Sequence, residues 1–237
     1  MDLSTFGMAF LIVCIGSMIQ GSVGIGLGFV AVPLLVLLDP RFVPGPLLLA
    51  ALFLTALVSY REYGSIDRKG IKWASIGRLI GTIFAAYVLT ILPQRHLGLL
   101  FAVIIIIAVL LSISGINWNV TAGSLLGTGA LSGFMGTAAA IGGVPLALLY
   151  QKYQGAQLRG TLSVIFVIGT IISLVVLALI GRFRIPELQL ALVLLPGILV
   201  GFLVSGKTAA ILDEGWIRPA VLIMATLSAV AVIIKNL

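Results

Sequence analysis

The sequence predicts an all-α polytopic membrane protein built from two homologous repeats of about four apolar segments each. Three observations predict this fold class. The composition is 61% hydrophobic and 9% charged, whereas soluble domains carry roughly 25% charged residues. Long apolar segments follow one another along the chain, and glycine-rich motifs recur at related positions. A chain of 237 residues built in this way leaves no room for a soluble catalytic domain.

Most of the apolar segments have the length of an ordinary membrane span. In chain order they lie at roughly 4–38, 43–60, 71–92, 97–116, 120–150, 160–181, 187–206 and 216–235. The first and the fifth are exceptions, because a straight helix of their length would be about 50 Å long, against a hydrocarbon core of about 30 Å. Each also has glycines near its middle, at Gly21–Gly28 and Gly133–Gly143. We therefore predict a glycine-broken or re-entrant helix in each; a tilted, kinked single helix is the alternative.

The two long segments also resemble one another, which predicts an internal duplication. With an offset of 112 residues, five positions of the first segment recur as identical residues in the second: Gly21, Gly24, Val32, Pro33 and Leu34. Further along, an offset of 120 residues relates Gly77 and Gly81 to Gly197 and Gly201. We therefore expect two membrane repeats, 1–116 and 117–237, within one integral membrane domain.

The basic loops predict the orientation. The most basic loop, REYGSIDRKGIK, lies between two spans, and such loops are usually cytoplasmic. If the long segments re-enter, each half has three full passes and the second half is inverted; if they cross once, the halves are parallel. The distribution of basic residues favours inversion slightly. Inverted repeats with broken helices facing each other at the midplane form a common secondary-transporter architecture.

The net charge of +7 indicates basic cytoplasmic loops, and an electropositive entrance for an anion is a second use for it. Nucleic acid is not implied. The expected partners are a small-molecule anion and the lipid bilayer, and a homodimer is left open. Cys14 is the single cysteine, which excludes an intrachain disulfide and any multi-cysteine metal site. We expect no cofactor and no metal.

No carboxylate lies in the centre of a predicted span. The acidic residues, all at the terminus or in or beside loops, are Asp2, Asp39, Glu62, Asp67, Glu187, Asp213 and Glu214. Proton pumps and sodium symporters usually need an intramembrane carboxylate. The sequence therefore favours anion flux driven by gradient and potential, or proton coupling through the substrate's own protonation. Because paired carboxylates and a Ser/His/Asp set are absent from the spans, an enzyme is not predicted.

The two glycine clusters predict one substrate site between the halves. A broken helix presents free N–H groups and a partial positive charge at the start of its second half, where an anion can bind. The expected site residues are Gln20, Gly24, Gly26 and Gly28 in the first half and Ser132, Gly136, Thr137, Gly142 and Gly143 in the second. For the glycines, close helix packing is the alternative; for Ser132, it is a hydrogen bond to its own helix.

Two arginines are further candidates for the substrate site. Arg78 lies inside an apolar span, and Arg159 immediately precedes one. Either guanidinium could bind a sulfonate or carboxylate through two parallel hydrogen bonds. For Arg78 the alternative is a side chain that extends to the membrane interface, and for Arg159 it is an ordinary loop cation.

The paired motifs GSVGIGLGFVAVP and SGFMGTAAAIGGVP, followed in the second half by RGTLS, resemble the sulfite exporter TauE/SafE family. The resemblance covers nearly the whole chain. Two departures from the family pattern are GIGLG at Gly24–Gly28, where the family commonly has G-I-G-G-G, and a displaced Gly142–Gly143 pair after Ala138–Ala140.

The resemblance implies a bacterial or archaeal inner-membrane transporter of small anions, often sulfur-containing ones such as sulfite or organosulfonates. We expect alternating access at a midplane site between the repeats. An anion-selective channel and a transporter of a non-sulfur organic anion are the alternatives.

Overall fold

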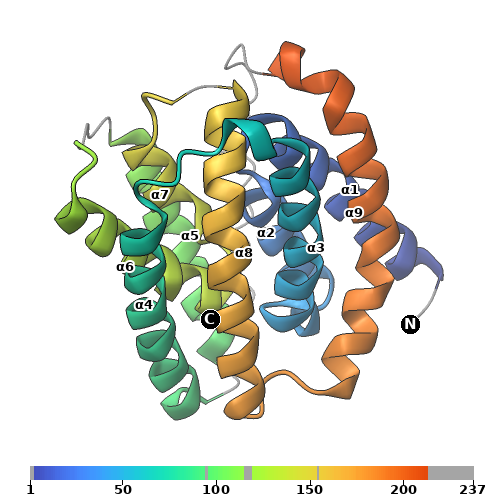
Figure 1. Ribbon diagram of the computed structural model, residues 1–237. Coiled ribbons are helices and arrows are strands. Elements are labelled where there is room, and N and C mark those ends of the chain that lie inside the picture. Colours follow the sequence, from blue (N-terminus) through green and yellow to red (C-terminus); the bar gives the residue numbers. More distant parts are fainter. Residues whose placement is uncertain (1–2, 94–95, 115–118, 154, 213–237) are drawn as a thin grey trace.

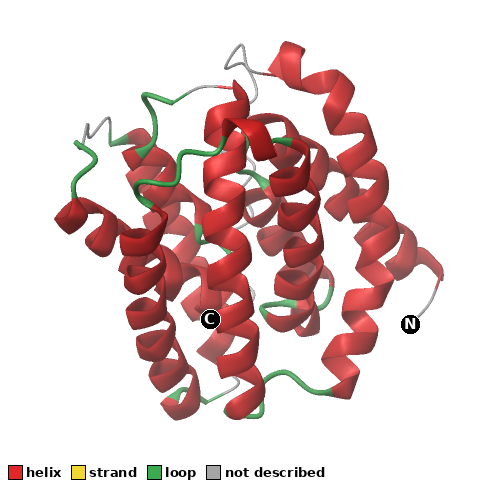
Figure 2. Cartoon of the chain, viewed as in Figure 1, coloured by secondary structure: helices red, strands yellow, loops and turns green. Residues whose placement is uncertain are grey.

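The computed structural model is all-helical over the residues that it describes, 3–93, 96–114, 119–153 and 155–212 (Figure 1 and Figure 2). The α-helices are α1 (Leu3–Val23), α2 (Leu27–Leu38), α3 (Gly45–Arg61), α4 (Ile71–Ile91), α5 (Leu97–Ile113), α6 (Ala122–Ala139), α7 (Gly143–Leu149), α8 (Gly155–Leu179) and α9 (Ile185–Leu212). Two 3₁₀ turns, η1 (Pro40–Phe42) and η2 (Tyr63–Ser65), flank α3. The segment predicted at 216–235 lies outside the described residues.

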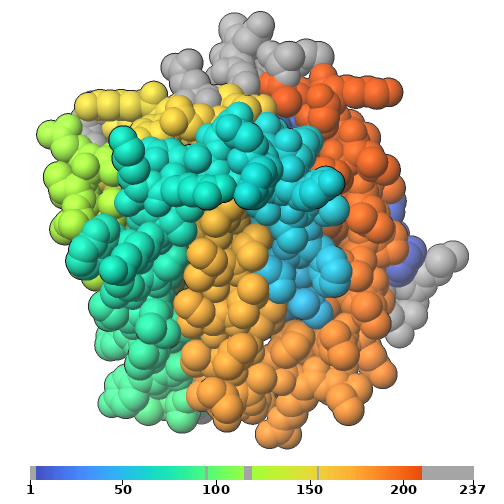
Figure 3. Space-filling model, viewed as in Figure 1, coloured from blue at the N-terminus to red at the C-terminus, as the bar shows by residue number. Residues whose placement is uncertain are grey.

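The chain is a multi-pass membrane protein. Within the described ranges, α1, α4, α8 and α9 contain segments long and apolar enough to cross a membrane, and α2, α3 and α5 are shorter apolar helices. Large apolar side chains remain exposed on the outer faces of these helices, for example Ile80, Ile83 and Phe84 on α4. Figure 3 shows one such face, where α4, α8, α3 and α9 lie at the surface. Lipid is the solvent that suits these faces.

Both long apolar segments are broken, as their length and glycines predict. Between α1 and α2, Gly24 and Gly26 have φ angles of 98° and 144°, a region that glycine enters without a Cβ penalty. The second break lies later than its glycines suggest, because α6 continues to Ala139 and the turn uses Ala140 at a φ of 58°. Gly136 and Thr137 therefore lie inside α6, and the expectation that they open the break is wrong.

Each short helix turns back on the helix before it. A methyl group on Gly16 would lie 3.3 Å from the Cα of Leu27, whereas one straight helix would place residues this far apart in sequence about 16 Å from each other. In the second half, the Ser132 hydroxyl of α6 donates to the carbonyl oxygen of Gly142, just before α7. Each long segment therefore folds back on itself as a helical hairpin.

Glycines bring helices of the first half close to helices of the second. The α4–α6 and α1–α9 pairs make the most extensive contacts, and α3 packs against α8 (Figure 1). A methyl group on Gly81 would overlap the carbonyl oxygen of Ala130, and one on Gly201 would overlap that of Cys14. Gly21 has the same close approach to α9, so the packing interpretation holds for this glycine.

Candidate functional site

The two chain breaks lie against each other inside the helix bundle. A methyl group on Gly28 would overlap the carbonyl oxygen of Ala140, and one on Gly143 would lie 3.1 Å from Cγ2 of Ile25. Because α2 begins at Leu27 and α7 at Gly143, both helices start at this contact. The repeated glycine motifs are thus brought together in space, and the partial positive charge at the N-terminus of α2 falls in the protein interior.

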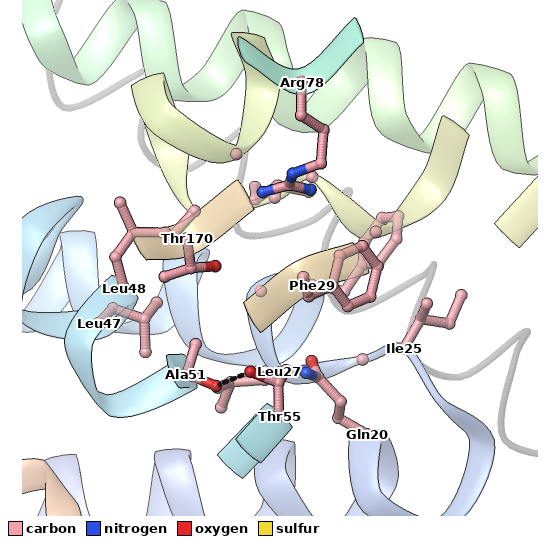
Figure 4. Close-up of a pocket in the computed structure, with 18 residues that line it drawn as sticks. Gln20, Ile25, Leu27, Phe29, Leu47, Leu48, Ala51, Thr55, Arg78 and Thr170 are labelled. Atoms are coloured by element: carbon pink, nitrogen blue, oxygen red, sulfur yellow. Dashed lines mark hydrogen bonds between the residues drawn. The ribbon is translucent and has the colours of Figure 1, made fainter. Parts of the chain in front are cut away.

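A cavity of about 60 Å³ lies where the breaks meet (Figure 4). One water needs on the order of 15 Å³ by this measure, so the cavity has room for about four water-sized groups, the size of a small oxyanion. Its walls come from both breaks and from α3, α4, α6 and α8. The expected site residues that line it are Gln20, Gly26, Gly28, Arg78, Gly136, Gly142 and Gly143.

The other expected site residues do not line the cavity; they are Gly24, Ser132, Thr137 and Arg159. The Gly24 amide donates to the carbonyl oxygen of Gln20 at 2.7 Å, so it is not available to a ligand. The Thr137 hydroxyl lies 2.7 Å from that of Ser173, at the buried contact of α6 with α8. The structure therefore gives these residues partners within the protein.

Arg78 is the cationic side chain of the cavity wall. The residue is 2% exposed, so the alternative of a side chain reaching the interface is wrong. Its Nη1 donates to the Ser132 hydroxyl at 2.7 Å, and its guanidinium carbon lies 5.4 Å from the centre of the Phe166 ring. Its Nε has no hydrogen-bond partner among the described residues. Figure 4 shows the guanidinium pointing into the cavity.

A buried cation is costly unless a negative group accompanies it. In the part of the chain that the structure describes, no salt bridge to Arg78 is formed; the salt bridges join Arg41 to Asp39 and both Arg61 and Arg159 to Glu62. The buried position of Arg78 therefore favours an anion in the cavity. Across the same described residues, no group of three or more His, Cys, Asp or Glu side chains could hold a metal ion.

Gln20 lies across the cavity from Arg78 in Figure 4. Its side-chain oxygen accepts a hydrogen bond from the Leu27 N–H at 3.1 Å, which leaves its NH₂ group as a donor. This bond also ties the end of α1 to the first turn of α2. Two side chains on opposite walls, Gln20 and Arg78, can therefore donate to one small ligand.

Two cavity residues that we did not predict are Thr55 of α3 and Thr170 of α8. A signal for them exists in the sequence, because the offset of 115 residues that relates Gly45 to Gly160 also relates Thr55 to Thr170. The apolar wall carries no comparable signal; it includes Ile25, Leu27, Phe29, Leu47, Leu48, Ala51, Ala140, Ile141 and Phe166.

A family model described as "Sulfite exporter TauE/SafE" matches residues 8–232 of the chain. The chain belongs to the TauE/SafE sulfite exporter family. TauE/SafE proteins are transporters, so the family and the apolar helices together identify a membrane transporter of sulfite or related anions. Comparisons with curated proteins and with solved structures find no match.

In this TauE/SafE protein, Gly169 of α8 makes room for the Arg78 side chain. A methyl group there would overlap Nε of Arg78 and lie 2.6 Å from its Cδ. We expect Gly169→Ala to displace the guanidinium and weaken anion binding about tenfold to a hundredfold, the cost of a charged hydrogen bond. Equilibrium binding of radiolabelled sulfite measures the effect.

The matched control is Gly206→Ala in α9, because nothing lies within 4 Å of a methyl group at that position. The control should bind sulfite like the parent protein. If Gly169→Ala also binds like the parent while folded, the placement of Arg78 does not depend on this glycine.

Proposed function

We propose that this TauE/SafE protein is a secondary transporter that moves a small sulfur oxyanion, sulfite or an organosulfonate, across the bacterial or archaeal inner membrane. The observation that carries the proposal is the buried guanidinium of Arg78, which forms no salt bridge within the described residues and lines a cavity between two broken helices. A sulfur oxyanion accepts charge-assisted hydrogen bonds from such a group.

The bound anion is held by donors from three directions. Arg78 donates from α4 and the Gln20 NH₂ group from α1. The first-turn amides of α2 have no acceptors within their own helix. The Leu27 N–H is used by Gln20, and the next two residues, Gly28 and Phe29, line the cavity, so we expect their amides to donate to the anion.

The same cavity disfavours large or strongly hydrated solutes. Leu47, Leu48 and Phe166 form an apolar part of its wall, so an anion must leave most of its water behind on entry. The room for about four water-sized groups suits sulfite itself, or a sulfonate with one or two carbon atoms. Among the described residues, no carboxylate lines the cavity, which supports flux driven by gradient and potential, or with the proton carried on the substrate.

Alternating access between two inverted repeats is part of this proposal. Its support is the matched set of helix contacts: α4 packs on α6 as α9 packs on α1, and α3 packs on α8. Thr55 and Thr170, equivalent positions of α3 and α8, line the same cavity. A pseudo-twofold axis between α3 and α8 would relate these contacts, and rocking of repeat 1–116 against repeat 117–237 would open the cavity to either side.

Flux into proteoliposomes tests the function. We expect saturable uptake of sulfite or of a two-carbon sulfonate such as sulfoacetate or taurine, accelerated by the same solute on the other side, with weaker or no uptake of sulfate, acetate and chloride. Imposed pH and voltage gradients reveal the driving force. Flux that neither saturates nor shows counterflow would indicate a channel, and no flux of any tested solute by folded, inserted protein would contradict the proposed substrate class.

A further inference from the structure

Besides Arg78, two further arginines lie beside the α1–α2 connection, outside the cavity. Arg61 at the end of α3 and Arg159 in α8 both donate from Nε to the same atom, Oε1 of Glu62, at 3.0 and 3.1 Å. Their side chains are 25% and 10% exposed, and that of Glu62 is 12% exposed. We call Arg61 and Arg159 the arginine pair. It holds a largely buried carboxylate close to the proposed transport site.

The end of α1 also holds the arginine pair in place. Arg61 donates from Nη2 to the carbonyl oxygen of Gly21, and Arg159 donates from Nη1 to that of Ser22 at 3.1 Å. Carbonyl groups in the last turn of a helix lack donors within the helix, and the negative end of the helix dipole favours cations. Both guanidiniums would therefore stay in position without the Glu62 carboxylate.

The α1–α2 connection adjoins both the arginine pair and the cavity. Gly26 lines the cavity, and a methyl group on Gly24, two residues earlier, would lie 3.3 Å from the Cα of Arg159. The two places therefore adjoin the same short segment of the chain.

We propose that the arginine pair is a second binding station for the transported oxyanion and that Glu62 is its resident carboxylate, displaced when the anion arrives. This inference rests on the proposed function. A carboxylate and a sulfur oxyanion present similarly spaced oxygen atoms to a guanidinium group. Glu62 therefore acts as a tethered competitor that occupies the station when no substrate is there.

The contacts of Glu62 suit an exchangeable group. Its side-chain hydrogen bonds within the described residues are those from the arginine pair. Its backbone N–H donates to the Val58 carbonyl at 2.9 Å, so the end of α3 does not depend on the side chain. The carboxylate can therefore leave the station without a change in the helix that carries it.

Equilibrium binding of ³⁵S-labelled sulfite to the full chain in lipid nanodiscs tests the station. We expect the parent protein to bind one sulfite per chain and Glu62→Gln to bind two, because the competitor is removed. At millimolar effective concentration of the tethered carboxylate, its removal should raise the affinity of the station about tenfold or more. Asp67→Asn is the matched control. Asp67 lies in the same loop and accepts hydrogen bonds from the Tyr153 hydroxyl and the Lys69 N–H. The Asp67→Asn variant should bind one sulfite per chain, like the parent protein.

Further variants make the outcome decisive. Arg159→Gln added to Glu62→Gln should return the count to one. Arg78→Gln added to Glu62→Gln should remove the cavity site and keep the station, so the two proposals fail separately. One sulfite per chain in folded Glu62→Gln would overturn the station. If that variant does not fold, Glu62→Asp, which withdraws the carboxylate, should bind a second sulfite with intermediate affinity, and unchanged binding there would overturn the station instead.

Discussion

Replacing Arg78 by glutamine is expected to weaken saturable anion uptake severely while the protein remains folded. The variant loses the positive charge of the cavity wall and the guanidinium donors that line the cavity. Removing one member of a buried, hydrogen-bonded charge pair costs about 2–5 kcal/mol, so the affinity for the anion should fall at least about thirtyfold. Initial rates of sulfite uptake into proteoliposomes, measured over a range of concentrations, give the change in KM.

A second arginine variant separates this effect from a general loss of positive charge. The side chain of Arg41 is 79% exposed and paired with Asp39, so Arg41→Gln should leave uptake at the parent level. Arg78→Lys should retain weak uptake, because lysine keeps the charge but not the planar set of donors. Parent-like KM values in folded Arg78→Gln would exclude this residue from the substrate site.

Filling the cavity with a larger side chain beside Arg78 should have an equally large effect. Gly136 lies in α6 and lines the cavity, and a methyl group there would lie 3.4 Å from both Nη2 of Arg78 and the Cα of Gly142. That spacing is ordinary contact, so Gly136→Ala should bind the anion nearly as the parent does. Gly136→Leu adds three further carbon atoms to a space of about 60 Å³ and should abolish binding.

The alanine variant is the control for the leucine variant, since both occupy the same position in the same helix. Sulfite binding and thermal unfolding should be measured on both proteins. The expected result is a folded leucine variant without detectable sulfite binding. Equal affinities in the two variants would show that the cavity is not where the anion binds.

The helix breaks could be predicted because their causes are local. A segment too long for one pass must break or tilt, and Gly24 and Gly26 supply the φ angles that a break needs. The second break lies within the predicted range Gly133–Gly143 but at its end, beyond Gly136 and Thr137. Its turn depends on Ala140, a residue type that rarely adopts a positive φ, and the contact with Gly28 of the other hairpin is not visible in a local pattern.

The site was predicted where glycines and a charge inside a span indicate it, and missed where distant residues meet. Arg78 stood out because a cation inside an apolar span is costly. The pairing of Arg159 with Glu62 could not be predicted in this way. The two residues are distant in sequence and meet through the packing of α3 on α8. Thr137 is a comparable case, since its hydroxyl bonds to Ser173 on another helix and turns a predicted ligand into a packing contact.

The most direct test of the central claim is an experimental structure of the full chain with selenite, the selenium analogue of sulfite, located by the anomalous signal of selenium. We expect a selenium peak in the cavity where the two breaks meet, within hydrogen-bond reach of the Arg78 guanidinium and the first turn of α2. A peak confined to other places, with the cavity empty at a saturating selenite concentration, would contradict the account.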